Sequence, residues 1–123
     1  MTITGTIVHG KQLGRTIGFP TANIRPESET MSLGANGVYI ALIRVEGYQN
    51  AMPCMVNQGK HPTAPEGAPT IEAHILDFDD DIYDLRAELT PLKFIRDERK
   101  FESLDALKAQ LHADLDTTRK YFE

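Results

Sequence analysis

The sequence predicts a mainly β protein, a small antiparallel barrel closed by one amphipathic C-terminal helix. Short runs rich in β-branched and aromatic residues recur about every 8 to 12 residues, and turn-forming residues separate them. The glycines and prolines precede residue 92, whereas residues 103–122 contain neither and carry leucines at helical spacing. A barrel is favoured over an open sheet because closure leaves no exposed strand edge. No repeat, low-complexity tract or linker is evident, so we expect one domain, with the barrel over about residues 1–100 and the helix over about 103–122.

Five stretches have the composition of strands, namely residues 4–8, 37–45, 51–57, 70–78 and 85–95. In residues 70–78 the alternation puts three apolar residues on one face, opposite Glu72 and His74, and extends the apolar face to Asp77. Pro91 indicates that the last stretch is an edge strand or contains a bulge, because proline lacks the N–H for a sheet hydrogen bond.

Residues 103–122 predict a helix that packs one apolar face on the barrel. Ser103 is placed to cap its N-terminus, with Asp105 in the first turn and Arg119 and Lys120 in the last, as the helix dipole favours. The apolar positions at helical spacing are Leu104, Leu107, Leu111, Leu115 and Phe122.

The charge balance excludes some classes of partner. The chain has 13 Lys and Arg residues against 18 Asp and Glu, so we expect no basic surface for nucleic acid or anionic membranes. Cys54 is the single cysteine, which excludes an internal disulfide and fits a reducing compartment. No apolar run approaches the roughly 20 residues that span a bilayer, and the N-terminus lacks the pattern of a signal peptide. We therefore expect a soluble, cytoplasmic protein.

Residues 10–23 hold the densest cluster of conformationally special residues, with three glycines and a proline. Glycine-rich loops with exposed amides bind phosphates in many proteins. Thr21 and Asn23 add neutral oxygen ligands of the type that a hard cation accepts beside substrate phosphates. The spacing matches neither a Walker A loop nor a dinucleotide-binding fingerprint, and an ordinary long turn is the alternative.

Glu72 lies within a strand pattern, where carboxylates are uncommon. A strand is a rigid support for a general base that must stay within hydrogen-bond reach of a hydroxyl. The alternative is a solvent-facing Glu72 on an edge strand. His74 shares its face and is interpreted as structural, because no second His, Cys or carboxylate stands at metal-ligand spacing.

Residues 94–101 combine basic residues with aromatic ones. Arg96 and Arg99 stand between Phe94 and Phe101, and such a set could clamp a planar ring and an anion, because arginine both stacks and donates paired hydrogen bonds. A solvated hinge before the helix is the alternative.

Four motifs stand in order along essentially the whole chain. They are Gly14-Arg15-x-x-Gly18-x-Pro20-Thr21-Ala22-Asn23, Gly37-Val38-Tyr39, Ile71-Glu72-x-His74-Ile75-Leu76-Asp77-Phe78 and Arg96-x-Glu98-x-x-Phe101-x-Ser103. In this order and spacing they resemble the riboflavin kinase (flavokinase) family, which in bacteria is usually the C-terminal half of bifunctional FAD synthetase.

The resemblance implies a six-stranded antiparallel barrel with Greek-key connections. It also implies transfer of the ATP γ-phosphoryl group to the 5′-hydroxyl of riboflavin, giving FMN, with Mg²⁺ held by Thr21 and Asn23 and with Glu72 as the catalytic base. The residues implied for nucleotide binding are Gly10, Gly14, Thr16, Gly18, Thr21, Ile75, Asp77 and Tyr83. Those implied for flavin binding are Arg96, Arg99 and Phe101. The net charge of −5 is compatible with ATP binding if a glycine-rich loop and a metal ion hold the phosphates locally, because no basic surface is then needed.

A function of another class stays open, a catalytically silent flavin- or nucleotide-binding module on the same barrel. The presence of Glu72 together with Thr21 and Asn23 favours the enzyme, because a pure binder needs no base. An adenylyltransferase domain is an expected partner if the chain is one half of an FAD synthetase.

Two residues depart from the pattern of the resembled family. Asp84 stands where glycine is usual, and Gln58 stands within the family's Asn-Ile-Gly segment. Aspartate tolerates left-handed backbone geometry, so we expect the turn at Asp84 to survive.

Overall fold

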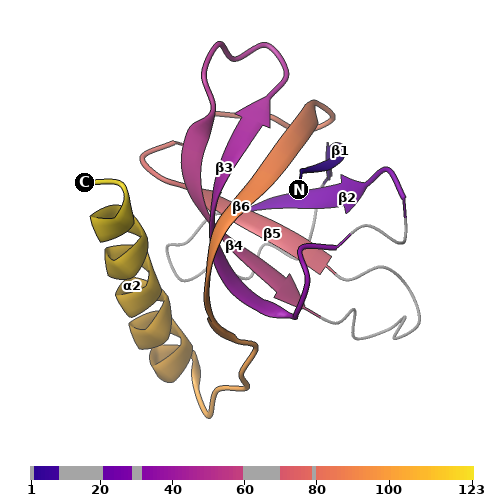
Figure 1. Ribbon diagram of the computed structural model, residues 1–123. Helices are drawn as coiled ribbons and strands as arrows, with labels where there is room; N and C mark the ends of the chain where they lie inside the picture. The colour runs from indigo at the N-terminus through magenta and orange to yellow at the C-terminus, as the bar shows by residue number, and fades with distance from the viewer. Residues whose placement is uncertain (1, 9–20, 29–31, 60–69, 79) are drawn as a thin grey trace.

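The computed structural model describes residues 2–8, 21–28, 32–59, 70–78 and 80–123. These ranges hold six strands and one helix, α2. The bounds are β1 Ile3–Val8, β2 Ala22–Pro26, β3 Gly37–Val45, β4 Met52–Gly59, β5 Thr70–Ile75, β6 Arg86–Asp97 and α2 Leu104–Tyr121. The strands wrap into a barrel, and α2 lies along one side of it (Figure 1).

The strands close the barrel in the order β1-β2-β5-β4-β3-β6, and every pairing is antiparallel. Strands β3, β4 and β5 pair consecutively, and β6 returns to lie on the free side of β3. Three consecutive strands with the fourth beside the first form a Greek key. The predicted mainly β, six-stranded Greek-key barrel with a C-terminal helix is therefore confirmed.

Strand β2 was not indicated by the sequence pattern. Residues 10–23 are expected to form one loop, but Ala22 and Asn23 already belong to β2. The strand has weak β propensity, with Ile24 as its one β-branched residue. Ile24 is 4% exposed and pairs with Ile7 of β1 and Ile71 of β5. We infer that residues 22–26 form a strand because they pair with β1 and β5 around the buried Ile24, and not because of their own β propensity.

Strand β5 ends at Ile75 and is shorter than the expected stretch 70–78. Leu76 donates its N–H to the Pro53 carbonyl at 3.0 Å, and Asp77 has a φ of 55°. This left-handed backbone takes the chain out of the strand. Asp77 is therefore exposed and does not continue the inward face of β5.

Strand β6 is irregular along its pairing with β3. Ala41 lies opposite Pro91 and Ile40 lies opposite Lys93, which leaves Leu92 as the additional residue of a bulge. The bulge that Pro91 indicates is confirmed. A second shift of register follows nearer the end of the strand.

Apolar side chains occupy both sides of the barrel wall. Inside, Ile7 and Leu89 are 0% exposed and belong to the main core cluster. Outside, Val38, Ile40 and Met55 are also buried, although they alternate with inward residues and stand apart from that cluster. Helix α2 contacts β4, which carries Met55, and its Asp114 pairs with Arg96, which lies opposite Val38, so we infer that α2 covers this outer apolar patch.

The ends of α2 are as the sequence predicts. Ser103 Oγ accepts a hydrogen bond from the Ala106 N–H at 3.1 Å, Asp105 lies in the first turn, and Arg119 and Lys120 lie in the last. No helix in the described part of the chain has the length and apolar character needed to cross a bilayer.

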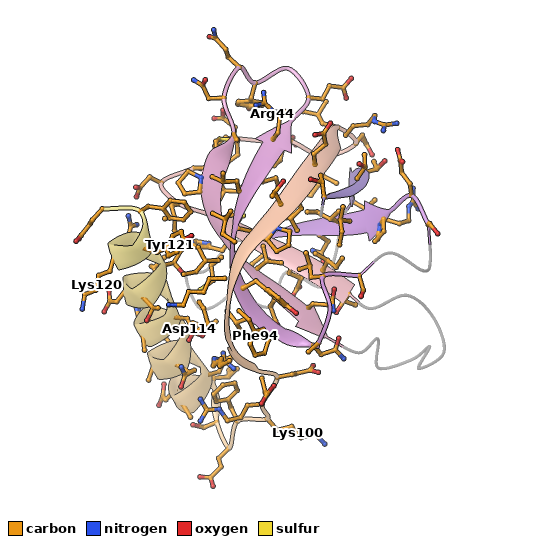
Figure 2. All side chains as sticks on the ribbon, viewed as in Figure 1. Arg44, Phe94, Lys100, Asp114, Lys120 and Tyr121 are labelled. Carbon is orange, nitrogen blue, oxygen red and sulfur yellow. The ribbon has the colours of Figure 1, made fainter. Side chains whose placement is uncertain are left out.

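The face of α2 that lies against the barrel is more polar than the leucine spacing predicts. Leu104 is 57% exposed, whereas Asp114 is 2% and Thr118 is 0% exposed. Figure 2 shows Asp114 on the side of the helix that faces the barrel. The Thr118 hydroxyl donates to the Asp114 carbonyl at 2.8 Å, and the Asp114 carboxylate pairs with Arg96. Both buried groups are therefore satisfied.

The two departures from the family pattern have local partners. Asp84 has a φ of 70°, and its N–H donates to the Ile7 carbonyl at 2.8 Å, so the expected left-handed turn is confirmed. Gln58 is 1% exposed; it accepts from the Leu33 N–H at 2.7 Å and donates to the Gly34 carbonyl at 2.9 Å. Gln58 therefore anchors the segment that precedes β3.

Replacing Gly37 by alanine is expected to destabilise the barrel by about 2–4 kcal/mol. Gly37 has a φ of 155°, and a Cβ there would overlap the Arg96 carbonyl oxygen and lie 2.8 Å from the Phe94 ring. The control is Gly47→Ala, where φ is 87° but a Cβ would meet nothing within 4 Å. Urea unfolding followed by circular dichroism compares the two variants. Equal losses would show that the close approach to β6 is not the cause.

Candidate functional site

The strand registers place Glu72 between two amide side chains on the outer face of the barrel. Glu72 of β5 pairs with Asn23 of β2 on one side and with Asn57 of β4 on the other. Its neighbours Ile71 and Ala73 are buried in the core, so Glu72 and its two partners point outward. Directly opposed side chains on antiparallel strands have Cβ atoms about 4.5–5.5 Å apart. A carboxylate is therefore held beside two groups that can both donate and accept hydrogen bonds.

The setting of Glu72 suits a group that must keep a fixed position. The edge-strand alternative is wrong, because β5 pairs with both β2 and β4 and Glu72 is only partly exposed. A carboxylate on such a strand can accept a proton from a hydroxyl placed against it. Asn57 was not among the predicted site residues, and its place beside Glu72 follows only from the register of β4 with β5.

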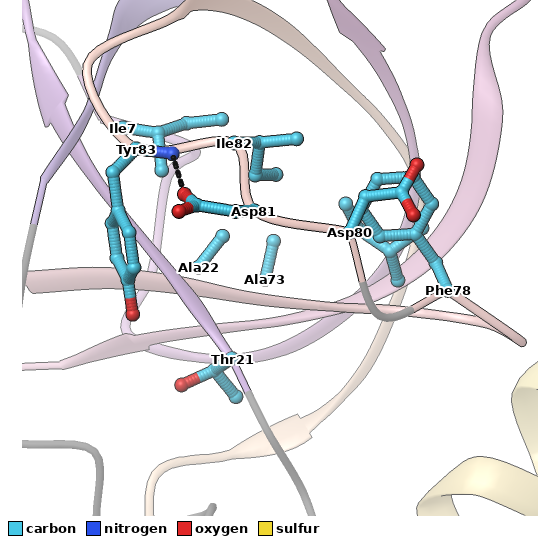
Figure 3. Close-up of a pocket in the computed structure, with 10 residues that line it drawn as sticks. Ile7, Thr21, Ala22, Ala73, Phe78, Asp80, Asp81, Ile82 and Tyr83 are labelled. Carbon is cyan, nitrogen blue, oxygen red and sulfur yellow. Dashed lines mark hydrogen bonds between the residues drawn. The ribbon is translucent and has the colours of Figure 1, made fainter.

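A cavity of about 290 Å³ lies at the end of the barrel where β1 ends and β2 begins (Figure 3). Three predicted nucleotide-binding residues line it, namely Thr21, Ile75 and Tyr83. Ile7 and Phe78 contribute to its apolar wall. The volume is close to the lower end of the range for small-molecule sites, about 300 Å³.

The Thr21 hydroxyl oxygen is buried and has no hydrogen-bond partner among the described residues. Such an atom in a folded protein calls for a ligand, an ion or a water. Thr21 precedes Asn23 by two positions, and hydroxyl and amide oxygens suit a hard cation that also binds phosphates. Within the described ranges no group of three or more His, Cys, Asp and Glu side chains could hold a metal. Thr21 and Asn23 fit a Mg²⁺ ion as two neutral oxygen ligands.

Two carboxylates, Asp80 and Asp81, line the same cavity. Asp80 accepts a hydrogen bond from the Tyr48 hydroxyl at 2.9 Å, and Asp81 accepts one from the Tyr83 N–H at 3.1 Å. The hydrogen bond to Asp80 raises the pKa of Tyr48. Because this wall would repel a bare polyanion, the cavity favours a neutral group or an anion whose charge a cation neutralises.

Asp77 is not among the residues that line the cavity. Its carboxylate accepts hydrogen bonds from Arg119 of α2, from Nη2 to Oδ1 at 2.9 Å and from Nη1 to Oδ2 at 3.1 Å. The pairing lowers the pKa of Asp77 and raises the pKa of Arg119. Both side chains are exposed, so the pair contributes little stability. The other nucleotide candidates lie outside the described residues: Gly10, Gly14, Thr16 and Gly18.

The predicted flavin-binding residues form a cluster between β6 and α2. The Arg96 Cζ lies 5.7 Å and the Arg99 Cζ 5.5 Å from the centroid of the Phe101 ring, a cation–π arrangement. The Arg96 side chain is 17% exposed, whereas residues 97–100 are exposed, so the segment combines one half-buried cation with a solvated stretch. Phe94 instead packs edge-to-face on Tyr39, with the ring centroids 5.0 Å apart.

The outward row that contains Glu72 continues to this cluster. Asn57 pairs with Val38 of β3, and Val38 pairs with Arg96 of β6. Glu72 and Arg96 are thus three strands apart along one face of the wall, about 14 Å at the usual strand spacing. The carboxylate and the arginine–aromatic cluster therefore share one side of the barrel.

Comparison with known proteins decides the family. The family model for flavokinase, described as riboflavin kinase, matches residues 1–122. The chain belongs to the flavokinase family. The family explains why the glycine-rich segment, the strand carboxylate and the arginine–aromatic segment occur in this order.

Relatives of this flavokinase chain include proteins with a second catalytic domain. The bifunctional riboflavin kinase/FMN adenylyltransferase of Haemophilus influenzae is 38% identical over 120 residues, which are 98% of this chain and 38% of the relative. The chain therefore spans well under half of that relative's length.

Two solved structures share the fold. A chain described as a macrolide-efflux protein from Streptococcus pneumoniae superposes with a TM-score of 0.85 at 36% identity, over 96% of this chain and 38% of that chain. Riboflavin kinase from Trypanosoma brucei superposes with a TM-score of 0.66 at 27% identity, over 98% of this chain and 78% of that chain.

Proposed function

We propose that the chain is a riboflavin kinase, which transfers the γ-phosphoryl group of ATP to the 5′-hydroxyl of riboflavin and releases FMN and ADP. Membership of the flavokinase family supports the proposal. The observation that carries it is the pairing of Glu72 with Asn23 across β5 and β2, because their chain neighbours Ala73 and Ala22 line the cavity together with Thr21. A module that only binds flavin needs no carboxylate at this place.

In this reaction Glu72 is the catalytic base. The 5′ oxygen of riboflavin forms a bond to the γ-phosphorus while the bond from that phosphorus to the β–γ bridging oxygen breaks. The proton of the hydroxyl passes to the Glu72 carboxylate. Pairing of β5 on both sides keeps the carboxylate in place, which favours catalysis because phosphoryl transfer depends mainly on positioning.

The nucleotide is proposed to occupy the cavity at the barrel end. Its base and ribose are uncharged and suit a wall that is apolar and acidic. Thr21 and Asn23 would hold the Mg²⁺ that accompanies ATP, and the ion would neutralise phosphate charge. Further contacts to the nucleotide are proposed for Ile75, Tyr83, Asp77, Gly10, Gly14, Thr16 and Gly18.

The flavin ring is proposed to lie against Arg96, Arg99 and Phe101, because guanidinium groups and aromatic rings both stack on planar heterocycles. Glu72 and Arg96 lie three strands apart on the same side of the barrel wall, with buried Val38 between them. Three strand spacings, about 14 Å, are a length that a ribityl chain with its tricyclic ring can span.

Replacing Asn23 by alanine is expected to raise the Mg²⁺ concentration for half-maximal activity about tenfold, the effect of losing about 1.4 kcal/mol of binding. The reason is the loss of an amide oxygen beside Glu72. Activity measured over a Mg²⁺ titration tests this, with Asn50→Ala, an exposed amide in the β3–β4 turn, as the control. An unchanged metal titration would count against Asn23 as a ligand.

The function itself is tested by incubating the chain with riboflavin, Mg²⁺ and either ATP or CTP, and by separating FMN from riboflavin chromatographically. We expect FMN with ATP. Riboflavin binding without FMN under either nucleotide would identify a binding module instead.

A partner domain and a cellular location are also proposed for the chain. An adenylyltransferase domain is a proposed partner, because the Haemophilus influenzae relative is bifunctional and the chain covers 38% of it. A cytoplasmic location is proposed as well, because the sequence has a single cysteine, Cys54, and so no internal disulfide of the kind common in oxidising compartments.

A further inference from the structure

Asp114 is the one charged side chain that is buried within the described ranges. It lies on α2, and its carboxylate accepts hydrogen bonds from Arg96 Nε at 3.1 Å and from Arg96 Nη2 at 2.8 Å. Gln110 Nε2 donates to the same carboxylate at 2.9 Å. Both oxygens of the Asp114 carboxylate therefore accept hydrogen bonds, as a buried carboxylate requires.

The hydrogen bonds of Asp114 reach Arg96 directly and Arg99 through Gln110, and both arginines lie over Phe101. Arg96 is bound directly, and its guanidinium lies over Phe101. Gln110 accepts a hydrogen bond from Arg99 Nη2 at 2.7 Å, and the Arg99 guanidinium also lies over Phe101. One carboxylate on the helix thus orients two cations around one aromatic ring.

Stability alone does not account for a carboxylate at this position. Asp114 shares its helix stripe with Leu107 and Leu111, and a buried ion pair is often no more stabilising than well-packed apolar residues. A paired guanidinium, in contrast, is held in one orientation, which removes the entropy of ordering a long side chain when ligand binds.

We propose that Asp114 is a positioning residue of the flavin site. It holds Arg96 directly and Arg99 through Gln110, so that the surface offered to the flavin ring is formed before the ligand arrives. This inference rests on the proposed function, because it concerns the ring-binding end of that site. It assigns no contact between Asp114 and either substrate.

The test is the variant Asp114→Asn, which keeps the shape of the side chain but removes its charge. Steady-state rates of FMN formation give the KM for riboflavin and the KM for ATP, and quenching of riboflavin fluorescence gives its Kd. We expect the KM and Kd for riboflavin to rise about tenfold, with the KM for ATP and kcat within twofold of the unmodified chain. The matched control is Asp116→Asn, which changes an exposed carboxylate on the same helix. It should leave the KM and the Kd for riboflavin unchanged.

A second, milder variant keeps the test decisive if Asp114→Asn does not fold. Gln110→Ala leaves the Asp114–Arg96 pair in place and removes both hydrogen bonds of Gln110, the one to Asp114 and the one from Arg99, so we expect about a threefold rise in the Kd for riboflavin. Unchanged riboflavin binding in this variant, or in folded Asp114→Asn, would overturn the inference, as would an equal rise in both KM values. An unmodified chain that neither binds riboflavin nor forms FMN would overturn the proposed function and the inference with it.

Discussion

Changing Glu72 to glutamine is expected to lower the turnover of riboflavin by on the order of 10²-fold or more, with riboflavin binding nearly unchanged. Glutamine keeps the shape of the side chain beside Asn23 and Asn57 and one of its two acceptor oxygens. It cannot accept the proton that the 5′-hydroxyl loses during attack on phosphorus. The rate of FMN formation measures the loss, and fluorescence quenching of riboflavin measures binding in the same variant.

The matched control for this prediction is Glu88→Gln. Glu88 is an exposed carboxylate on β6, paired with Thr4 and Arg44, and it lines neither the cavity at the barrel end nor the row through Glu72. It should behave like the unmodified chain. Wild-type-like turnover in Glu72→Gln would remove Glu72 from the role of base, and lost riboflavin binding would indicate a role in holding the substrate instead.

Removing residues 103–123 is expected to abolish cooperative folding. The deletion would expose the outer apolar patch of Val38, Ile40 and Met55, and it would leave Arg96 without the carboxylate of Asp114. Burial of three such side chains contributes about 5–9 kcal/mol. A domain of this size is stable by only about 5–15 kcal/mol, so the loss is comparable with the whole free energy of folding.

Thermal unfolding followed by circular dichroism tests the helix prediction, with deletion of exposed Glu123 alone as the control. We expect the control to melt cooperatively and the long deletion to show no transition. A cooperative melt in the long deletion would mean that the barrel folds without α2 and that the outer patch does not depend on it.

The chemistry of the candidate site could be read from local sequence, but its geometry could not. Glu72 was identifiable because a carboxylate is unusual in a strand, and Thr21 and Asn23 because they follow a glycine-rich segment. That Asn23 lies beside Glu72 depends on the register of β2 with β5. Asn57 carries no local signal at all, because only its register with β5 makes it a neighbour of Glu72.

Local pattern was sufficient for features that arise within one segment. β-Branched and aromatic composition identified β3, alternation of side chains identified β5, and the residues around Ser103 set the start of α2. Pro91 indicated the bulge in β6. These features depend on backbone preferences and on neighbours a few residues away, which sequence alone specifies.

The features that local sequence did not predict depend on pairing between segments that are distant along the chain. Strand β2 has little propensity of its own and exists because Ile24 is buried between β1 and β5. Asp114 reads from sequence as one more polar residue on a helix, and it becomes a buried partner only because Arg96 reaches it from β6. The cavity and the outward row likewise join segments that are distant along the chain. Local propensity carries no information about such contacts, because their free energy comes from burial and pairing that exist only once the barrel has closed.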